Sequence, residues 1–445
     1  MENKNRKVVW LVSICFALYL FFSLLSVVFQ WNFEPFNKVN LVAELFPNAI
    51  PSEEKETDKE LVVAVNLPQQ VFSLYQNSHT ITNFYEGDSL VALPHFVEKL
   101  HTLKNTGKGK IRIAYLGDSM IEGDLISQTF RKLLQAEFGG NGVGYLPMFS
   151  NVSGYRQSAT ISASNWQDLS FKTKNQKNFY LSGHIFKGLG SGSYKDNTIA
   201  ENSITEKIII FGKSEGDVVE INGEKMTLQG KNLVNRKVIS LDANNLIKVK
   251  SHSSKLPIYG VAFESENGVF VDNFSFRGIT GVELDKLETD FLQAIQDNNP
   301  YDLVILQYGV NLLFRAKDTD YSYYEKLVSP AFSKIKKVFE KSDVLLVSVG
   351  DKAFRYSGEY KTAIGLPNLI ELQAKLAFEN GFSFYNQFQT MGGENTIVEW
   401  VKQKPALAAK DHTHPSAKGA EVLAQLLFDA VMKDYQKYQP KNQAK

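Results

Sequence analysis

Four short segments of the chain each follow an apolar run and carry groups suited to acyl transfer. The first is Gly117-Asp118-Ser119-Met120, directly after the apolar run Ile111–Leu116. A glycine permits a tight turn there, and we expect a helix to start next, so that backbone N–H groups and the helix dipole face an anion at Ser119. Ser119 is therefore a candidate nucleophile, although a Gly-Asp-Ser tripeptide taken alone is more often an ordinary helix-capping turn.

The second segment lies near the C-terminus, where Asp411 and His414 form an Asp-x-x-His-Pro arrangement. Three residues apart in a turn, a carboxylate can hold one imidazole nitrogen and leave the other free as a base. His412 competes for this role, but as the neighbour of Asp411 it points elsewhere, so we favour His414. The alternative is a surface histidine beside a helix that Ser416 caps.

The third and fourth segments offer donors for a developing oxyanion. Gly278 follows the apolar run 269–276, and Asn311 lies in the Gly309-Val310-Asn311 turn after another strand-like run. A tetrahedral intermediate needs two or three donors aimed at its oxygen, and a glycine N–H and an Asn amide both serve. Each turn alone is ordinary, but their joint order with the serine and Asp-His segments argues for one site.

Two arginines flank the proposed oxyanion turns. Arg277 and Arg315 are weak candidates for holding a carboxylate or a sugar hydroxyl of the substrate, and solvated or structurally paired arginines are the alternative. His412 and His414 lack a matching Cys or carboxylate cluster, so we expect no metal and no cofactor.

The elements around these turns alternate between short apolar strands and amphipathic helices, which predicts an α/β fold with a mostly parallel sheet between two helix layers. At the carboxyl edge of such a sheet reactive groups collect. The expected strands are 111–116, 269–276, 301–309, 344–350 and 382–386, and the expected helices are 124–138, 284–297, 323–341, 366–380 and 418–433.

Between Tyr155 and Glu264 helical periodicity gives way to short β-type runs separated by Gly, Asn and Ser turns, with an Asn222-Gly223 hairpin motif. This predicts a β-sandwich, jelly-roll-like, inserted into the α/β domain. The expected division is a cytoplasmic tip and membrane anchor (1–29), a stalk (30–82), the first part of the α/β domain (83–154), the insert (155–265), the second part (266–436) and a tail (437–445).

The N-terminal run Val8–Phe29 holds 22 residues without charge or proline, and about 20 apolar residues span a bilayer as helix. Lys4, Arg6 and Lys7 precede it, which predicts a cytoplasmic N-terminus and an external remainder. A cleaved signal peptide is the alternative, but the run exceeds the usual length and no A-x-A-like site follows. We therefore favour a single-pass anchor in the cytoplasmic membrane, with the catalytic domain on the periplasmic or extracellular side.

The overall charge excludes one class of partner. Lys and Arg total 49 against 48 Asp and Glu, so the chain has no overall basic field. Phosphate binding needs a concentrated cationic surface, and nucleic acid is therefore not an expected partner.

Together the four segments, Gly-Asp-Ser, an oxyanion Gly, Gly-x-Asn and Asp-x-x-His, resemble the blocks of the SGNH (GDSL-type) hydrolases over about residues 90–150 and 266–435. The resemblance implies Ser119 as nucleophile and main-chain donor, Gly278 and Asn311 as oxyanion donors, and Asp411 with His414 as the acid and base of a triad. The chain departs from the pattern at Leu312, where the third block usually has an acid.

A closer similarity, to bacterial peptidoglycan O-acetylesterases, is carried by the stretches GDSMIEGDLIS, GNGVGY, IYGVAFESENGVFVDNFSFRG, MGGENTIVEW and PALAAKDHTHPSAKGAEVLA. Members of that branch can carry a β domain similar to a carbohydrate-binding module. The resemblance implies a carboxylic-ester hydrolase that removes O-acetyl groups from peptidoglycan or another envelope polysaccharide. Two alternatives remain: a polysaccharide O-acetyltransferase with a membrane O-acyltransferase as partner, and a non-catalytic glycan-binding protein.

Overall fold

The computed structural model describes residues 4–29, 41–42, 68–86, 90–199 and 202–439. The chain separates into two compact units, Met1–Leu67 and Pro68–Lys445. In the first unit, helix α1 (Lys4–Val28) contains a span, Val8–Val28, that is long and apolar enough to cross a membrane, with a mean hydropathy of 2.5. A signal sequence meets the same criterion of length and apolar composition.

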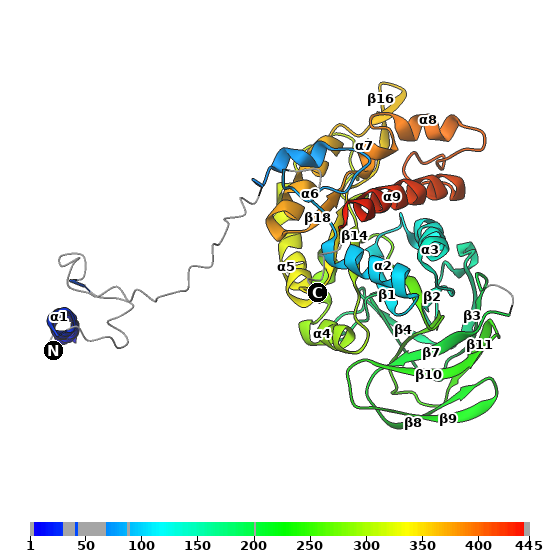
Figure 1. Ribbon diagram of the computed structural model, residues 1–445, viewed down its shortest axis with the longest axis horizontal. Helices are drawn as coiled ribbons and strands as arrows, with labels where there is room; N and C mark the ends of the chain where they lie inside the picture. Colours follow the sequence, from blue (N-terminus) through cyan, green and yellow to red (C-terminus); the bar gives the residue numbers. More distant parts are fainter. Residues whose placement is uncertain (1–3, 30–40, 43–67, 87–89, 200–201, 440–445) are drawn as a thin grey trace. The chain divides into compact units, whose positions relative to one another are not determined.

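The second unit is built on a five-stranded, wholly parallel sheet with the strand order β13-β1-β14-β15-β18. Its strands are β1 (Lys110–Gly117), β13 (Gly268–Ser275), β14 (Leu303–Gln307), β15 (Asp343–Val347) and β18 (Ser383–Tyr385). The order reverses direction at β1, and open α/β sheets bind ligands outside the carboxyl ends of the strands at such a point. Figure 1 shows this sheet among the helices of the unit.

Alternating side chains of the strands divide the core into two layers. In β1, Ile113 and Tyr115 face one apolar cluster, and Ala114 and Leu116 face the other. The first cluster contains side chains of α2 (Pro94–Thr106), α3 (Leu125–Phe138) and α9 (Ala417–Lys437), and the second those of α4 (Thr289–Asn298), α5 (Ser322–Val338) and α6 (Leu366–Asn380). The three-layer α/β/α arrangement is therefore confirmed, and Figure 1 shows α9 beside α3.

Two antiparallel sheets pack around a third apolar cluster, to which strands of both contribute. One sheet has the order β10-β7-β12-β5-β4, with β2 added beside β12, and the other has the order β3-β6-β11-β8-β9. The strands are β2 (Gly144–Leu146), β3 (Ala159–Ser164), β4 (Gln167–Ser170), β5 (His184–Lys187), β6 (Ser191–Asp196), β7 (Thr205–Phe211), β8 (Ser214–Ile221), β9 (Glu224–Gly230), β10 (Asn235–Asp242), β11 (Leu246–Ser251) and β12 (Ile258–Glu264). The sandwich expected from the sequence is thus present.

The hairpin predicted at Asn222-Gly223 is confirmed, because it joins β8 to β9 with both turn residues at positive φ. Strand β2, Gly144–Leu146, differs from the sequence expectation: it pairs with β12 and so adds residues before position 155 to the antiparallel part. The hairpin of β16 (Ala353–Tyr356) and β17 (Glu359–Thr362) and the short helices α7 (Gln387–Met391) and α8 (Thr396–Lys402) were not expected.

The expected stalk, residues 30–82, lies largely outside the described residues, including its charged run. Its last part is not a spacer, because the compact unit begins at Pro68. Thr82 forms a β-bridge with Phe384, and Phe84 is buried in an aromatic cluster.

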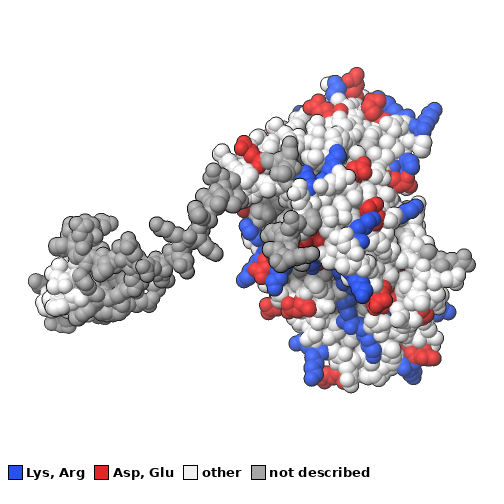
Figure 2. All heavy atoms as spheres, in the orientation of Figure 1, with Lys and Arg blue, Asp and Glu red and all other residues white. Residues whose placement is uncertain are grey.

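A buried ionic cluster joins the parallel sheet to the sandwich. Glu264, at the end of β12, is fully buried and pairs with Arg112 and Lys110 of β1 and with Arg236 of β10, each within 3.1 Å. Burial alone would raise the pKa of the Glu264 carboxyl, but Arg236, Arg112 and Lys110 together hold this pKa well below its usual range. On the face shown in Figure 2, in contrast, acidic and basic side chains are mixed.

We predict that Glu264→Gln lowers the free energy of unfolding by about 3–5 kcal/mol, because it leaves buried cations without their counter-charge. The exposed pair Glu359–Lys361 provides the control, since Glu359→Gln should cost no more than about 1 kcal/mol. Urea unfolding of both variants at pH 7 measures this. Equal losses in the two variants would contradict the assignment. Because the Glu264 pKa is depressed, its stabilisation is present above the unfolded-state pKa of about 4.3 and is lost on acidification.

Candidate active site

The turn that carries Ser119 starts at the carboxyl end of β1 with Gly117, which has no side chain. A Cβ on Gly117 would lie 2.9 Å from the carbonyl oxygen of Gln307 on the neighbouring strand β14, so only glycine fits there. Ser119 itself is half-buried. The helix expected at 124–138 is confirmed as α3 (Leu125–Phe138), and a short 3-10 turn (Glu122–Asp124) separates it from Ser119.

Asp124 is the reason for this separation. It adopts a left-handed conformation with φ 64°, and its buried carboxylate binds Arg131 of α3 at 2.8 Å and Arg156 at 3.2 Å. The helix dipole of α3 therefore acts on Asp124 and its partners, and anion stabilisation at Ser119 must come from local N–H groups.

Ser119, His414 and Asp411 form a continuous hydrogen-bonded chain. The Oγ of Ser119 lies 2.9 Å from Nε2 of His414, and Nδ1 of His414 lies 2.7 Å from Oδ2 of Asp411. The structure thus brings Ser119 into contact with His414, 295 residues later in the sequence, which is paired with Asp411 of the same loop. This geometry suits removal of the serine proton by the imidazole, with the carboxylate fixing the ring and stabilising its positive charge.

The loop before α9 holds the acid of this chain in place. The second oxygen of Asp411 accepts the backbone N–H groups of Thr413 at 3.0 Å and of His414 at 3.1 Å. Burial would raise the pKa of the Asp411 carboxyl, but these bonds and the His414 imidazole hold its pKa below the usual value. The carboxylate therefore stays ionised beside the base over the neutral pH range.

His412, the competing base, lies elsewhere in the same loop. Its Nδ1 is 3.0 Å from the carbonyl oxygen of Lys410, and its ring stacks on Tyr360 at 3.7 Å between centroids. Ser416 caps α9 by accepting the N–H of Gly419. The geometry therefore distinguishes the two histidines in the way that the sequence suggested.

Asn311 follows β14 and is tied to both neighbouring loops. Its Nδ2 donates to the carbonyl oxygen of Ile279 at 2.8 Å and to Oδ2 of Asp118 at 3.3 Å. An oxyanion held by this amide would replace the longer of the two bonds, the one to Asp118. Gly278, in the loop after β13, has φ 83° and is exposed, and an added Cβ would meet nothing within 4 Å. Its requirement for glycine is therefore conformational.

Asp118, between Gly117 and the serine, is a residue whose role the sequence did not reveal. Its side chain is completely buried and accepts the N–H of Met120 at 3.0 Å as well as the Asn311 amide. Burial raises the pKa of Asp118 to about 7, and the Met120 N–H and the charge of Lys352 only partly oppose this effect. A titrating carboxyl thus lies directly behind the serine.

Lys352 is the second residue that the sequence did not reveal. It follows β15, and its Nζ donates to the carbonyl oxygens of Val310, at 3.2 Å, and of Leu313, on either side of Asn311. Burial lowers the Lys352 pKa, and the carboxylates of Asp411 and Asp118 oppose this. Leu312 of the same loop is buried, and the Lys352 bonds to the main chain support this loop.

The two arginines singled out in the sequence have different surroundings. Arg277 forms an ion pair with Glu122, with its Nε 2.8 Å from the carboxylate, and so links the loop after β13 to the serine turn. Arg315 is exposed and lies over the ring of Phe314, 5.0 Å from its centroid. Only Arg277 is thereby placed beside the Ser119 turn. In the described part of the chain, no three His, Cys, Asp or Glu side chains are grouped as metal ligands.

The fold has a counterpart among solved structures. A peptidoglycan O-acetylesterase aligns with a TM-score of 0.64 and 22% identity, covering 81% of this chain and 99% of that one. The match shows that the two share a fold. The α/β architecture with added antiparallel sheets that the sequence predicts is confirmed by the strand topology.

Two further solved structures match with lower scores: an acetyl xylan esterase (18% identity, 37% of this chain and 82% of that one, TM-score 0.27) and a GDSL-like lipase from Parabacteroides merdae (16% identity, 38% and 74%, TM-score 0.27). These TM-scores are too low to establish a shared fold. No family model matches the chain. No curated protein matches it.

The hydrogen bonds that join Ser119, His414 and Asp411 predict a reactive serine. We expect a fluorophosphonate probe to label the wild type and to leave Ser119→Ala unlabelled, and His414→Ala should slow labelling on the order of 10³-fold because the base is lost. His412→Ala is the matched control, because it removes a neighbouring imidazole that takes no part in the Ser119–His414–Asp411 hydrogen bonds. It should be labelled at nearly the wild-type rate. Labelling rates measured by mass spectrometry decide between the histidines, and equal rates for the two variants would refute the assignment.

Asp118 predicts an unusual pH dependence of stability. Its pKa is about 7 in the folded chain and about 3.9 when unfolded, so the folded state binds the proton more tightly. The Asp118 contribution to stability therefore falls as pH rises from about 4 to 7. Relative to wild type, Asp118→Asn should gain on the order of 4 kcal/mol between pH 4 and pH 8. Urea unfolding measures this, and a constant difference between the two proteins would rule out the shift.

Proposed function

We propose that this chain is an SGNH-type serine esterase that removes O-acetyl groups from peptidoglycan or another cell-envelope polysaccharide. The observation that carries the proposal is the Ser119–His414–Asp411 hydrogen-bonded chain at the carboxyl edge of the parallel sheet. The fold shared with a peptidoglycan O-acetylesterase over almost the whole of that protein supports the substrate class.

The proposed reaction begins when His414 takes the Ser119 proton as the hydroxyl attacks the acetyl carbonyl. The N–H groups of Ser119 and Gly278 and the Asn311 amide stabilise the oxyanion. His414 then protonates the sugar oxygen, the sugar hydroxyl leaves, and an acetyl ester on Ser119 remains. Water, deprotonated by the same imidazole, releases acetate in a second round.

The location proposed for this reaction is the outer side of the cytoplasmic membrane. The apolar helix Val8–Val28 would anchor the chain, and the basic residues before it would hold the N-terminus in the cytoplasm. The catalytic unit would then meet acetylated glycans of the envelope. In an esterase a water molecule attacks the acyl-enzyme. In an O-acetyltransferase that works with a membrane acyltransferase, a sugar hydroxyl attacks the same acyl-enzyme instead.

Acetate release from a panel of O-acetylated glycans tests the proposal. Ser119→Ala should lower kcat on the order of 10⁴–10⁶-fold because the nucleophile is absent. Asn311→Ala should lower it by about 10²–10³-fold because one oxyanion donor is lost. Ser164→Ala, at an exposed serine of β3, should retain wild-type activity.

The same assay separates the rival functions. An excess of newly acetylated glycan over free acetate, when an acetyl donor and an unacetylated glycan are supplied together, would point to transfer in place of hydrolysis. Absence of both products, together with an unlabelled serine, would leave a glycan-binding protein.

A further inference from the structure

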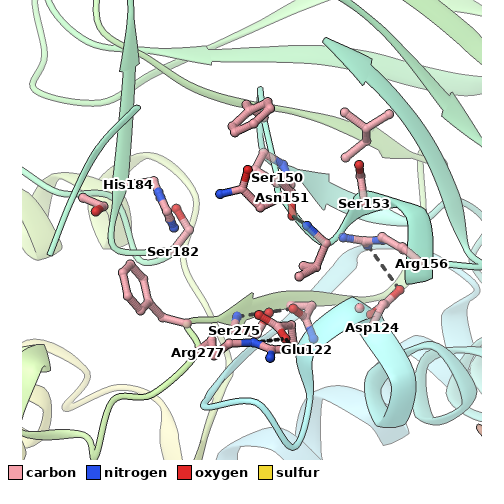
Figure 3. Close-up of a pocket in the computed structure, with 18 of the residues that line it drawn as sticks. Glu122, Asp124, Ser150, Asn151, Ser153, Arg156, Ser182, His184, Ser275 and Arg277 are labelled. Atoms are coloured by element: carbon pink, nitrogen blue, oxygen red, sulfur yellow. Dashed lines mark hydrogen bonds and ion pairs between the residues drawn. The ribbon is translucent and has the colours of Figure 1, made fainter. Parts of the chain in front are cut away.

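A cavity of about 290 Å³ lies beside the serine turn, where the parallel sheet meets the sandwich (Figure 3). One part of its wall comes from the loops that bear Ser119 and Gly278, and the other part comes from the antiparallel sheets and the segment that leads into them. From the first part come Glu122, Ser275, Phe276 and Arg277, and from the second come Ser150, Asn151, Ser153, Arg156, Asp168, Ser170, Ser182 and His184.

The cavity borders the turn that carries the nucleophile. The backbone N–H of Glu122 lies 3.4 Å from the carbonyl oxygen of Ser119, so Glu122 belongs to the same turn as the serine. Arg277, the neighbour of Gly278, binds the Glu122 carboxylate across the floor of the cavity. A ligand in the cavity would therefore touch the two loops that frame the reacting carbonyl.

His184 is the group in this wall that is best prepared to bind a ligand. Its Nδ1 lies 2.6 Å from Oδ1 of Asp168, and its ring stacks on Phe276 at 4.9 Å between centroids. These contacts fix both the orientation and the tautomer of the imidazole. Among the described residues no hydrogen-bond partner is found for its Nε2, which leaves this atom for a ligand. About a quarter of the side chain is exposed.

The remaining wall is rich in hydroxyl and amide groups. Figure 3 shows Ser182 beside His184, with Asn151 and Ser150 across the cavity from them. A volume of about 290 Å³ lies at the lower end of the range for small-molecule sites, about 300–1,000 Å³, which suits one sugar ring better than a long chain. Hydroxyl and amide groups such as these form hydrogen bonds with the hydroxyls of a pyranose.

The charges of the wall are mostly paired. Each acid that lines the cavity holds a base, since the pairs are Glu122 with Arg277, Asp124 with Arg156, and Asp168 with His184. One further cation, the exposed Lys172, also lines the cavity, with its Nζ over the ring of Phe276. Paired charges give little field to attract a polyanion, so a hydroxyl-bearing sugar fits this wall better than a polyanion.

We propose that this cavity is a subsite for a sugar unit adjacent to the acetylated one, with Nε2 of His184 bonded to a sugar hydroxyl. The subsite deepens the esterase function proposed above and rests on it. It implies that the enzyme recognises at least two consecutive sugars, so that a glycan chain is a better substrate than an isolated ester.

The test compares an O-acetylated chitotriose with 4-nitrophenyl acetate, a substrate that has no second sugar. For the full-length protein, His184→Phe keeps an aromatic ring on Phe276 but removes Nε2, and it should lower the ratio of kcat/KM values, trisaccharide over small ester, at least 10-fold. His252→Phe is the matched control. It disrupts another histidine–carboxylate pair, His252 with Glu220, at similar exposure, and it should leave the ratio unchanged. Equal losses on both substrates would overturn the subsite.

A second variant and a binding measurement guard against misfolding and against failure of the esterase proposal. Asn151→Trp, at an exposed loop position, should fill the cavity and lower the same ratio without a change in Tm. Calorimetry with unacetylated chitotriose and Ser119→Ala reports binding without hydrolysis. Binding that is lost in His184→Phe supports the subsite even if no acetate is released by the wild type, whereas binding unaffected by both cavity variants refutes it.

Discussion

The parallel register of three adjacent strands is the constraint on which the site depends. Gly117 at the end of β1 lies opposite Ser275 of β13 on one side and Gln307 of β14 on the other. The loops that carry Ser119, Gly278 and Asn311 therefore leave the sheet at one level. The approach of Gln307 to Gly117 leaves no room for a side chain, so any larger residue would push the serine turn off this edge. The hydrogen-bonded strands thereby fix the points at which the three loops begin.

The sandwich is bound to this edge by buried charges that sit in the low dielectric between the two parts. Asp124, which ends the serine turn, binds Arg156 and accepts the hydroxyl of Ser158 from the segment that enters the sandwich. Burial would raise the pKa of Asp124, but Arg131 and Arg156 hold it well below its usual range. Such pairs contribute little net stability, yet breaking one is costly, so they enforce a single arrangement of the serine turn against the sandwich.

Local sequence patterns predict much of the fold and of the candidate site. The Asp411–His414 spacing is a property of one turn, and alternating strands and helices imply a parallel sheet whose carboxyl edge gathers the motifs. The parts that were not predicted arise from tertiary contacts. Nothing adjacent in sequence shows that Lys352 supports the Asn311 loop, or that burial shifts Asp118. The 3-10 turn between Ser119 and α3 was not predicted for a similar reason, because it ends at the left-handed Asp124, whose carboxylate binds Arg131 and Arg156.

The space on the two sides of the serine differs, and this difference bears on which ester the site accepts. Behind the turn, a void lined by Asp118, Met120 and Val310 measures only about 10 Å³, roughly the room of one water molecule. On the sandwich side lies the cavity of about 290 Å³. An ester with a small acyl group and a bulky, hydroxyl-rich alcohol matches this asymmetry, whereas a long acyl chain does not. The half-exposed imidazole of His414 also suits an ester that projects from a polymer, since a chain of sugars could lie across the edge of the sheet without entering the core.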